Sequence, residues 1–477
     1  MTETFQKEKS KYQETRRTFW NLNSEIKDRS WGGYYHTRLQ QVYRLVIPEG
    51  VSVLEVGCGH GDLLAALKPS FGVGVDFSES MISIARHRHP NMEFIVADAH
   101  ELDLGGRTFD YIVLSDLVND LWDVQAMLER LNSCCEPKTR LIFNYYSHLW
   151  GGVLLLAQKL GIATPNLRQN WLTRIDIINL LELSGFQTLR SWEEVVAPLY
   201  IPFISGIANR YLSKISPFRF LSLANIMIAR PRPQPRKDLP TVSVIVAARN
   251  EKGHIAELMA RIPEMGGGTE IIFVEGHSSD DTYGAIEREM EKNPHRRCKL
   301  LKQPGKGKGD AVRLGFAEAS GDILMILDAD ITVPPEDLPR FFNVIASGEA
   351  EFVNGVRLVY PMQNDAMQFA NLVGNKFFSW AFSWLMGQPI RDTLCGTKVI
   401  WADDYRRLAD NRTYFGDFDP FGDFDLLFGA AKLNLKIMEV PIRYRARRYG
   451  DTNIQRWRHG VLLLRMAVFA AHRIKFV

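Results

Sequence analysis

The stretch of residues 305–338, GKGKGDAVRLGFAEASGDILMILDADITVPPEDL, decides the predicted fold of the second half of the chain. Its middle, residues 322–328, is short and almost wholly apolar, which is typical of a buried parallel strand. The run ends in Asp328-Ala-Asp330, at the strand end where open α/β sheets place their ligand chemistry. Because unpaired carboxylates are costly there, the pattern predicts a divalent cation held by oxygen ligands. In the alternative reading, Asp328 caps the next loop and Asp330 is a solvated turn residue.

The bulk composition bounds the class of protein. A chain of 477 residues is too long for one ordinary core, so two domains of roughly 200–250 residues are expected. The net charge of +3 predicts no global surface for polyanions, and no nucleic-acid partner is expected. Five cysteines without C-x-x-C pairing argue against a zinc site or a disulfide framework, which favours a reducing, cytoplasmic location. The charged N-terminus lacks the apolar core of a signal peptide.

No segment reaches the roughly eighteen uninterrupted apolar residues of a membrane-spanning helix. Residues 377–390 and 461–477 come nearest, and either could be a core helix. Both could also lie in a membrane interface, with aromatic residues on one face and basic residues on the other. The second alternative predicts a chain that is peripheral at the cytoplasmic face of a membrane.

Strands alternate with helical segments along the chain, which predicts an α/β fold with two doubly wound domains. The first series closes near residue 230. Residues 231–240 combine prolines with charge and have no period, so they are predicted to be a linker. A second series fills residues 241–477 and ends in an amphipathic helix. The strands expected in the first domain are 51–56, 72–76, 94–97, 109–115 and 220–229.

A glycine-rich turn follows the first of these strands. Residues 57–61 read GCGHG, a backbone that turns tightly against a ligand. Asp62 stands where the dinucleotide pattern G-x-G-x-x-G needs a glycine, which argues against that pattern. Asp76 ends the second strand, where its carboxylate can accept hydrogen bonds from both ribose hydroxyls. Asp76 could instead cap the next helix. Asp98 follows the third strand and can reach an adenine edge.

Four motifs in register, LEVGCGHG, GVDFS, FIVADAHEL and FDYIVLSDL, resemble the class I S-adenosylmethionine-dependent methyltransferases. The resemblance covers residues 45–230 and implies a Rossmann-like sheet that binds S-adenosylmethionine. It leaves the methyl acceptor open. Candidates for a base there are His36, His100, Asp116 and His148, although surface histidines without a role are an alternative. The cofactor residues that the resemblance implies are Glu55, Gly57, Gly59 and Gly61 for the methionine part, Asp76 for the ribose, Asp98 and Ala99 for the adenine, and Ser115 at the start of the methyl-delivery loop.

The second domain has polar loops after its first two strands. Residues 242–248 run into Arg249-Asn250-Glu251, and residues 270–274 run into EGHSSDDT. The latter loop offers carboxylates and hydroxyls suited to a base and ribose, or it simply caps a helix. In residues 305–309, two lysines stand among glycines that let backbone N–H groups approach a phosphate.

The motifs AARNE, VEGHSSDDT, GKGKGDAVRLGF and MILDAD resemble family 2 glycosyltransferases of the GT-A type, and among them the polyprenyl- or dolichyl-phosphate sugar transferases. The resemblance implies inverting transfer from a nucleoside-diphosphate sugar with Mg²⁺ or Mn²⁺, to a lipid phosphate or a glycan. Glu275 replaces the aspartate usual in its loop. Asp328 and Asp330 are the implied metal ligands, with Asp330 in the more direct contact. The implied donor-binding residues are Asn250, Glu251, Glu275, Lys306, Lys308, Asp328 and Arg456.

Acidic and basic runs near the C-terminus complete this pattern. Asp423 and Asp425 are predicted to be catalytic, and Asp423 is the first choice of base if the acceptor is a hydroxyl. A phosphate acceptor needs no base, and the cluster could instead cap a helix. Residues 443–458 resemble the loop that closes over the donor diphosphate, or they bind anionic lipid headgroups. No nucleic-acid module accompanies them.

The chain is therefore predicted to be a bifunctional transferase that acts on a glycan, glycolipid or lipid-linked sugar of the cell envelope. In one alternative, the first domain binds S-adenosylmethionine only to regulate an active glycosyltransferase. In another, the chain is a peripheral membrane scaffold without enzymatic activity.

Overall fold

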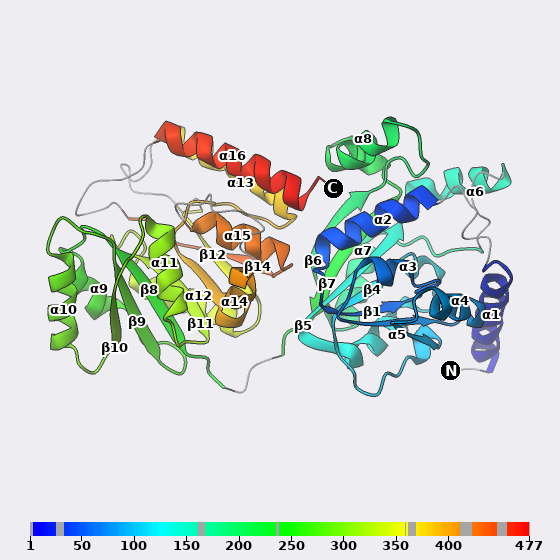
Figure 1. Ribbon diagram of the computed structural model, residues 1–477, viewed down its shortest axis with the longest axis horizontal. Helices are drawn as coiled ribbons and strands as arrows, with labels where there is room; N and C mark the ends of the chain where they lie inside the picture. Colours follow the sequence, from blue (N-terminus) through cyan, green and yellow to red (C-terminus); the bar gives the residue numbers. More distant parts are fainter. Residues whose placement is uncertain are drawn as a thin grey trace. The chain divides into compact units, whose positions relative to one another are not determined.

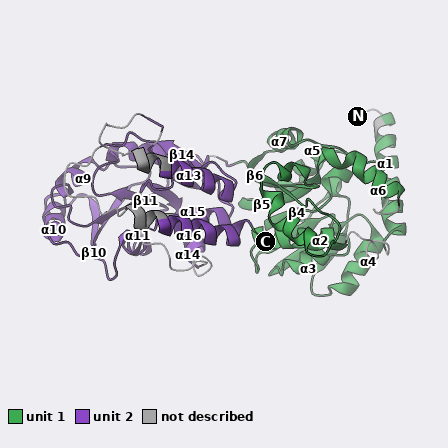
Figure 2. Cartoon of the chain, turned by 90° about the horizontal axis from the view of Figure 1, so that it is seen from above, with its two compact units in different colours: residues 1–232, 476–477 green, residues 233–475 purple. Residues whose placement is uncertain are grey.

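The computed structural model describes residues 3–24, 33–160, 167–234, 238–357, 359–360, 369–410, 422–445 and 456–476. The chain divides into two compact units (Figure 1, Figure 2). Unit 1 comprises residues 1–232 with 476–477, and unit 2 comprises residues 233–475. Each unit is built on its own seven-stranded sheet.

The sheet of unit 1 has the strand order β3-β2-β1-β4-β5-β7-β6. Strands β3 to β5 are parallel in this order, and β7 is antiparallel to both β5 and β6. The parallel strands therefore end at one edge, where the glycine turn follows β1. The strands are β1 (Ser52–Val56), β2 (Phe71–Asp76), β3 (Glu93–Val96), β4 (Phe109–Leu114), β5 (Cys135–Tyr146), β6 (Phe186–Glu194) and β7 (Ala224–Pro231).

Helices cover both faces of this sheet, because apolar side chains of the strands form one core on each face. Side chains of α2, α3 and α4 share one core, and those of α5 and α7 share the other. Short 3-10 helices, η2 to η7, stand in the connections. The helices are α1 (Glu3–Leu22), α2 (Gly33–Val46), α3 (Asp62–Ala66), α4 (Glu79–Arg88), η2 (Ala99–Glu101), η3 (Val118–Asp120), α5 (Val124–Leu131), η4 (Asn132–Cys134), η5 (His148–Trp150), α6 (Gly151–Lys159), α7 (Arg174–Leu183), α8 (Ile204–Arg210), η6 (Leu212–Lys214) and η7 (Phe218–Leu221).

The sheet of unit 2 has the order β10-β9-β8-β11-β13-β12-β14. Only β13 runs against its neighbours, so the other six strands end at the same edge. This edge holds the loops in which the donor-binding residues are predicted. The strands are β8 (Val242–Ala248), β9 (Thr269–Glu275), β10 (Arg297–Lys302), β11 (Ile323–Asp328), β12 (Phe352–Val356), β13 (Lys398–Trp401) and β14 (Ile437–Pro441).

Two cores also flank the sheet of unit 2. One contains side chains of α9, α10 and α12, and the other contains side chains of α11 and α13 to α16. The helices are α9 (Ile255–Arg261), α10 (Thr282–Lys292), α11 (Lys308–Ala317), η8 (Pro335–Asp337), α12 (Leu338–Ala346), α13 (Phe369–Met386), α14 (Ala402–Asp410), α15 (Asp423–Lys432) and α16 (Arg456–Ile474).

The predicted fold class of two doubly wound α/β domains is confirmed. One strand boundary is wrong: residues 218–221 form η7, and β7 begins only at Ala224. The mostly apolar residues 220–223, Phe-Leu-Ser-Leu, do not distinguish a 3-10 turn from a strand, and the sequence does not indicate the antiparallel direction of β7 and β13. Residues 378, 382, 385 and 386 of α13 are buried in the core. Among the described residues, no helix is long and apolar enough to cross a bilayer.

Candidate active sites

The glycine positions of the turn after β1 leave no room for side chains. Gly57, Gly59 and Gly61 all have positive φ, and the amides of Gly57 and Cys58 both donate to the carbonyl of Val75. A Cβ on Gly61 would lie 2.5 Å from the ring of Phe94, and one on Gly57 would lie 3.0 Å from Leu117. Glycine is therefore required at positions 57 and 61, both by the positive φ and by the close approach of Leu117 and Phe94.

Two buried carboxylates hold this turn in place. Glu55 accepts a hydrogen bond from the amide of Leu64 at 3.0 Å. Asp76 accepts one from the amide of Gly59 at 3.0 Å and another from the amide of Ser78 at 2.9 Å. Ser78, not Asp76, is the N-cap of α4. The structure thus places Glu55, Asp76 and the glycine turn together at the carboxyl ends of β1 and β2, and this arrangement fits a cofactor bound over the turn.

Helix α1 lies across the same edge, which the sequence did not predict. Its Gln13 donates to Asp98 at 2.8 Å, and its Asn21 accepts from the hydroxyl of Ser78 at 2.6 Å. The other oxygen of Asp98 contacts the ring of His100 at 2.7 Å. Burial raises the pKa of Asp98, but His100 outweighs burial and leaves that pKa below its usual value. Nothing in the sequence of α1 indicated that Gln13 would contact Asp98, which is 85 residues further along the chain.

A fourth carboxylate lies at the end of β4, where Ser115 and Asp116 follow the strand. Asp116 has a positive φ of 56° and accepts from Tyr35 at 2.7 Å and from Asn144 at 2.6 Å. The imidazole of His36 lies 3.8 Å from its other oxygen. Burial, reinforced by Asp116, raises the pKa of Tyr35 well above its ordinary value. Tyr35 therefore remains a neutral hydrogen-bond donor, and of the four predicted base candidates His36 and Asp116 are the two in contact.

In unit 2, the loops after β8 and β9 are tied to each other. Asn250, at a positive φ of 58°, accepts from the amide of Ser279 at 2.7 Å. Glu275 accepts from the amide of Ser278 at 2.5 Å. The amide of Glu251 donates to the hydroxyl of Thr282 at 3.0 Å. The predicted donor-binding residues of these two loops are thus neighbours at the carboxyl edge.

Residues 305–309, called the lysine-glycine turn below, contact the end of β11. The ammonium of Lys308 lies 2.5 Å from a carboxylate oxygen of Asp328. Burial raises the pKa of Asp328, but Lys308, Lys398 and Arg357 lower it below its usual range, so the carboxylate stays ionised. A Cβ on Gly396 would collide with both the Asp328 carboxylate and the Lys308 ammonium. Gly396 is therefore required for this ion pair to form, whereas Lys306 is exposed to solvent.

Asp330 is two residues further along. One of its oxygens accepts from the amide and the hydroxyl of Thr332, at 3.1 and 2.7 Å. Within the described part of the chain, no group of three or more His, Cys, Asp or Glu side chains could hold a metal on its own. The donor set still fits Mg²⁺ in a substrate complex, because Mg²⁺ is commonly bound by one or two carboxylates together with substrate phosphates.

A buried ion pair between Arg357 and Asp392 lies next to the end of β12. The sequence did not predict that these two residues are partners. Asp392, which is fully buried, makes two hydrogen bonds to the Arg357 guanidinium, at 2.7 and 2.8 Å. Asn375 adds a third at 3.1 Å. Burial raises the pKa of Asp392, but Arg357 outweighs it and lowers the pKa to about 2. The pair fixes the end of β12 to the turn that contains Gly396.

Helix α15 begins against the lysine-glycine turn. A Cβ on Gly422, its N-cap, would lie 2.7 Å from the Cα of Gly309, so the two backbones touch. Asp425 lies 3.9 Å from Arg313 of α11. The side chains of Asp423 and Arg456, and residues 446–455 of the basic run, lie outside the described residues. Of the predicted acceptor side, only Asp425 is thus placed by its side chain.

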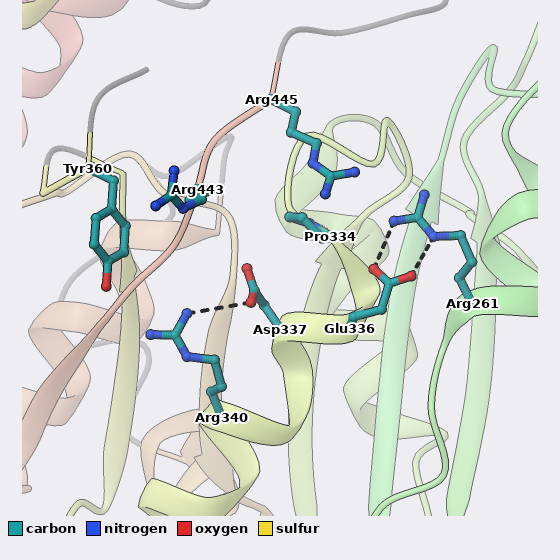
Figure 3. Close-up of a pocket in the computed structure, with 8 residues that line it drawn as sticks. All are labelled: Arg261, Pro334, Glu336, Asp337, Arg340, Tyr360, Arg443 and Arg445. Carbon is teal, nitrogen blue, oxygen red and sulfur yellow. Dashed lines mark hydrogen bonds and ion pairs between the residues drawn. The ribbon is translucent and has the colours of Figure 1, made fainter. Parts of the chain in front are cut away.

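A basic pocket of about 470 Å³ adjoins the loop of Asp330 (Figure 3). The amide of Arg445 donates to the carbonyl of Thr332, the residue that also holds Asp330. Arg261 forms a two-bond pair with Glu336, and Arg443 stacks on Tyr360 at 5.2 Å. The pocket lining is Arg261, Pro334, Glu336, Asp337, Arg340, Tyr360, Arg443 and Arg445.

Comparison with known proteins assigns both units. Residues 53–138 match the model of the methyltransferase domain, and residues 243–419 match the model of glycosyl transferase family 2. The chain joins a methyltransferase domain to a family 2 glycosyltransferase domain. The first match covers the glycine turn and the strands around it, and the second covers the loops from β8 to the Gly396 turn and beyond.

Individual proteins are similar to parts of this chain. The low-salt glycan biosynthesis hexosyltransferase of Haloferax volcanii is 28% identical over 234 residues, which are 47% of this chain and 53% of the relative. The dolichyl-phosphate hexose transferase of the same organism is 28% identical over 223 residues, 46% of this chain and 90% of the relative. The chain thus spans about half the length of the first relative. Magnesium protoporphyrin IX methyltransferase from Synechocystis, with bound SAH, is 20% identical over 46% of this chain and all of that chain, with a TM-score of 0.34.

Proposed function

We propose that the chain is a bifunctional transferase. Its second domain transfers a sugar, with inversion and a divalent metal, from a nucleoside-diphosphate sugar to a lipid phosphate or glycan. Its first domain methylates a small molecule, glycan or lipid with S-adenosylmethionine. The proposed division is 1–230 for the methyltransferase domain, 231–240 for the linker and 241–477 for the glycosyltransferase domain. The observation that supports it most is the ion pair of Lys308 with Asp328 at the edge of the family 2 sheet.

The donor is proposed to bind at the loops of Asn250, Glu251 and Glu275, with its diphosphate at the lysine-glycine turn. A diphosphate is a stronger partner for Lys308 than a single carboxylate, because it presents more charge and more acceptor oxygens. Lys308 then turns to the diphosphate and Asp328 is released towards the sugar. A divalent cation held by Asp330 and Asp328 would supply charge that stabilises the leaving diphosphate. Lys306 and Arg456 are proposed as further phosphate contacts.

The acceptor is proposed to be a lipid phosphate. Relatives named dolichyl-phosphate hexose transferase and dolichol-phosphate mannosyltransferase support this class of acceptor. A phosphate acceptor is already an anion, so the attack needs no general base. A hydroxyl acceptor would instead need Asp423 or Asp425, and the contact of Asp425 with Arg313 keeps that side chain at the start of α15. A lipid acceptor also favours a peripheral location at the cytoplasmic face of a membrane.

The methyltransferase half is proposed to hold S-adenosylmethionine over the glycine turn. Glu55 and Asp76 hold the turn, and Asp98 with Ala99 borders the adenine. Ser115 and Asp116 border the methyl-delivery loop, where Tyr35 donates to Asp116. Tyr35 and Asn144 both donate to one oxygen of Asp116 and hold its carboxylate in place, which suits Asp116 to orient or deprotonate a nucleophile.

One experiment tests both halves. The full chain is incubated with a panel of nucleoside-diphosphate sugars, Mg²⁺ or Mn²⁺ and a polyprenyl phosphate, with and without S-adenosylmethionine, and the products are read by mass spectrometry. A sugar-phosphate lipid and a separate mass gain of one methyl group support the proposal. Sugar transfer that changes in Asp76→Ala, with no methylated product from any acceptor, would support a regulatory first domain instead. Absence of both products over the whole panel would favour the scaffold.

A further inference from the structure

Exposed apolar side chains are concentrated in two segments of unit 1. Fifteen of the 28 exposed large apolar residues in the described part of the chain fall within residues 149–160 and 200–221. Apolar residues scattered singly over a surface are normal, whereas a contiguous exposed group marks a contact with another apolar phase. The two segments together are called the apolar surface below.

Helix α6 is the first part of the apolar surface. Its sequence is GGVLLLAQK, and none of its residues is buried. Val153, Leu155 and Leu156 are 52%, 60% and 59% exposed, and Leu149 and Leu160 beside them are more exposed still. An apolar helix of this length gains little from its own hydrogen bonds, since helices in proteins are stabilised mainly by burial of one face. Only Leu154 of α6 packs against the core of unit 1, and the other large apolar side chains of the helix are more than half exposed.

Residues 200–221 form the second part, around α8 and η7. Phe203 is 89% exposed, and Ile204 and Ile207 on α8 are 60% and 57% exposed. Phe220 and Leu221 on η7 are about half exposed. Only small or polar side chains of α8, among them Ser205 and Asn209, face inward. The apolar side chains of this helix therefore point to the outside, the reverse of the usual pattern.

The two parts are joined to each other. The indole N–H of Trp150 donates to the carbonyl of Leu221 at 2.9 Å, and the amide of Ser147 donates to the carbonyl of Leu223 at 2.7 Å. Figure 1 shows α6 and α8 on the same side of unit 1. Because β5 ends at Tyr146 beside the first residue of β7, both parts leave the sheet at one edge. They form one surface rather than two separate ones.

The charge of these segments selects the partner. Residues 137–175 and 195–237 contain no Asp or Glu at all. The basic residues there include Lys159 and Arg210, which are exposed, and Arg219, which stacks on Phe220 at 4.9 Å. In a chain with almost equal numbers of acidic and basic residues, this is a strong local bias. Apolar side chains bordered by basic ones and free of acidic ones are suited to the interface of an anionic bilayer.

We propose that unit 1 docks onto an anionic lipid bilayer through the apolar surface. The large side chains of α6 and of residues 200–221 enter the boundary between headgroups and acyl chains, while Lys159, Arg210 and Arg219 meet lipid phosphates. The inference uses only the exposure and charge of these segments, and it stands whether or not either transfer reaction is found. It differs from the interface segments expected from the sequence, 377–390 and 461–477, which belong to unit 2.

The position of the surface adds a consequence for the methyl acceptor, and this step rests on the proposed function. The apolar surface leaves the sheet at the carboxyl end of β5, next to the carboxyl end of β4, where Asp116 lies. The rings of Tyr146 and Tyr35 are 6.3 Å apart, and Tyr35 donates to Asp116. A lipid-borne acceptor would therefore reach the methyl-delivery loop from the membrane side.

The test is co-sedimentation of the full chain with vesicles. Vesicles of phosphatidylcholine with about one third phosphatidylglycerol should bind the chain, and binding should weaken steeply when salt is raised from about 0.1 M. The triple variant Leu156→Ser, Phe203→Ser, Ile207→Ser should bind these vesicles at least about tenfold more weakly than the wild-type chain. Arg210→Gln with Lys159→Gln should weaken binding to anionic vesicles, with little change on phosphatidylcholine alone.

The matched control is the triple variant Phe377→Ser, Trp380→Ser, Leu464→Ser, whose side chains in unit 2 are 51%, 68% and 50% exposed. It should retain vesicle binding. All substituted side chains are exposed, so each variant is expected to fold. Circular dichroism melts check this. The proposal is overturned if only the unit 2 control loses binding, or if the wild-type chain does not sediment with anionic vesicles. It is also overturned if the unit 1 variant keeps vesicle binding and instead changes the oligomeric mass in light scattering, which would assign the surface to a second copy.

Discussion

The ammonium of Lys308 lies 2.5 Å from the carboxylate of Asp328, and both side chains are 27% exposed. Two residues that the sequence predicted for different parts of the donor are thus each other's partner. The pair lies where the end of β11 contacts the lysine-glycine turn. Under the proposed function, the diphosphate of the donor binds at this place. Lys308 lowers the pKa of Asp328, so the carboxylate stays ionised and in place when no substrate is bound.

Asp328→Asn should separate binding from turnover. The amide frees Lys308 for the diphosphate, so the affinity for the nucleoside diphosphate should stay within about threefold, while sugar transfer falls about 100-fold or more. Lys308→Ala should have the complementary effect and weaken nucleotide binding about tenfold. Calorimetry of nucleotide binding and steady-state kinetics check both. Lys292→Ala, an exposed lysine of α10, is the control, and unchanged turnover in Asp328→Asn would contradict the role given to that carboxylate.

Gly396→Ala should damage the same pair without removing a polar group. The added methyl group would collide with the Asp328 carboxylate and the Lys308 ammonium, so one of them must move. We expect sugar transfer to fall about tenfold or more while the chain remains folded, since a forced shift of this kind costs about 1–3 kcal/mol. Gly374→Ala on α13 is the matched control, because a Cβ there meets nothing within 4 Å. Equal activities of the two variants would show that the placement of the ion pair does not matter.

Stability at low pH should depend on Asp392. Burial raises the pKa of its carboxyl, but Arg357 lowers it to about 2 in the folded chain, against about 3.9 when unfolded. The unfolded chain therefore binds the extra proton first, so the contribution is complete above about pH 4 and is lost as pH falls towards 2. The loss should reach about 2–3 kcal/mol in urea unfolding of wild type. Asp392→Asn should be less stable throughout and should lack this part of the pH slope; an identical slope in both proteins would contradict the assignment.

Asp76→Asn should weaken S-adenosylmethionine binding. The substitution replaces the carboxylate that accepts two backbone hydrogen bonds, from the amides of Gly59 and Ser78, and hydrogen bonds to a charged group contribute about 1.5–3 kcal/mol each. Calorimetry should show binding weakened about 100-fold. Asp110→Asn is a close control, since Asp110 also accepts two hydrogen bonds, from the amide and hydroxyl of Ser52, but at the opposite end of its strand. Sugar transfer unchanged in both variants would indicate that the two domains work independently, and retention of cofactor affinity in Asp76→Asn would contradict the site.

The sequence predicted the positions of candidate site residues that belong to short local motifs at strand ends. The glycine turn, Asp76 and the lysine-glycine turn are local motifs, so their positions at strand ends followed from the strands alone. Contacts between distant segments could not be predicted: Gln13 and Asn21 reach Asp98 and Ser78 from α1, and Arg357 at the end of β12 pairs with Asp392 in the segment before β13. Such partners are chosen by tertiary packing, which leaves no periodic trace. The roles of the predicted site residues stay predictions until the variants are measured.

The contact between Gly309 and Gly422 has a kinetic consequence. The turn that would receive the donor diphosphate and the helix that begins at Asp423 touch backbone to backbone, with no side chain between them to absorb a displacement. Movement of the turn on arrival of the donor must therefore also move the start of α15. Under the proposed function, this favours a compulsory order, donor first and acceptor second. Product-inhibition patterns with the free nucleoside diphosphate, competitive against donor and noncompetitive against acceptor, would be its signature.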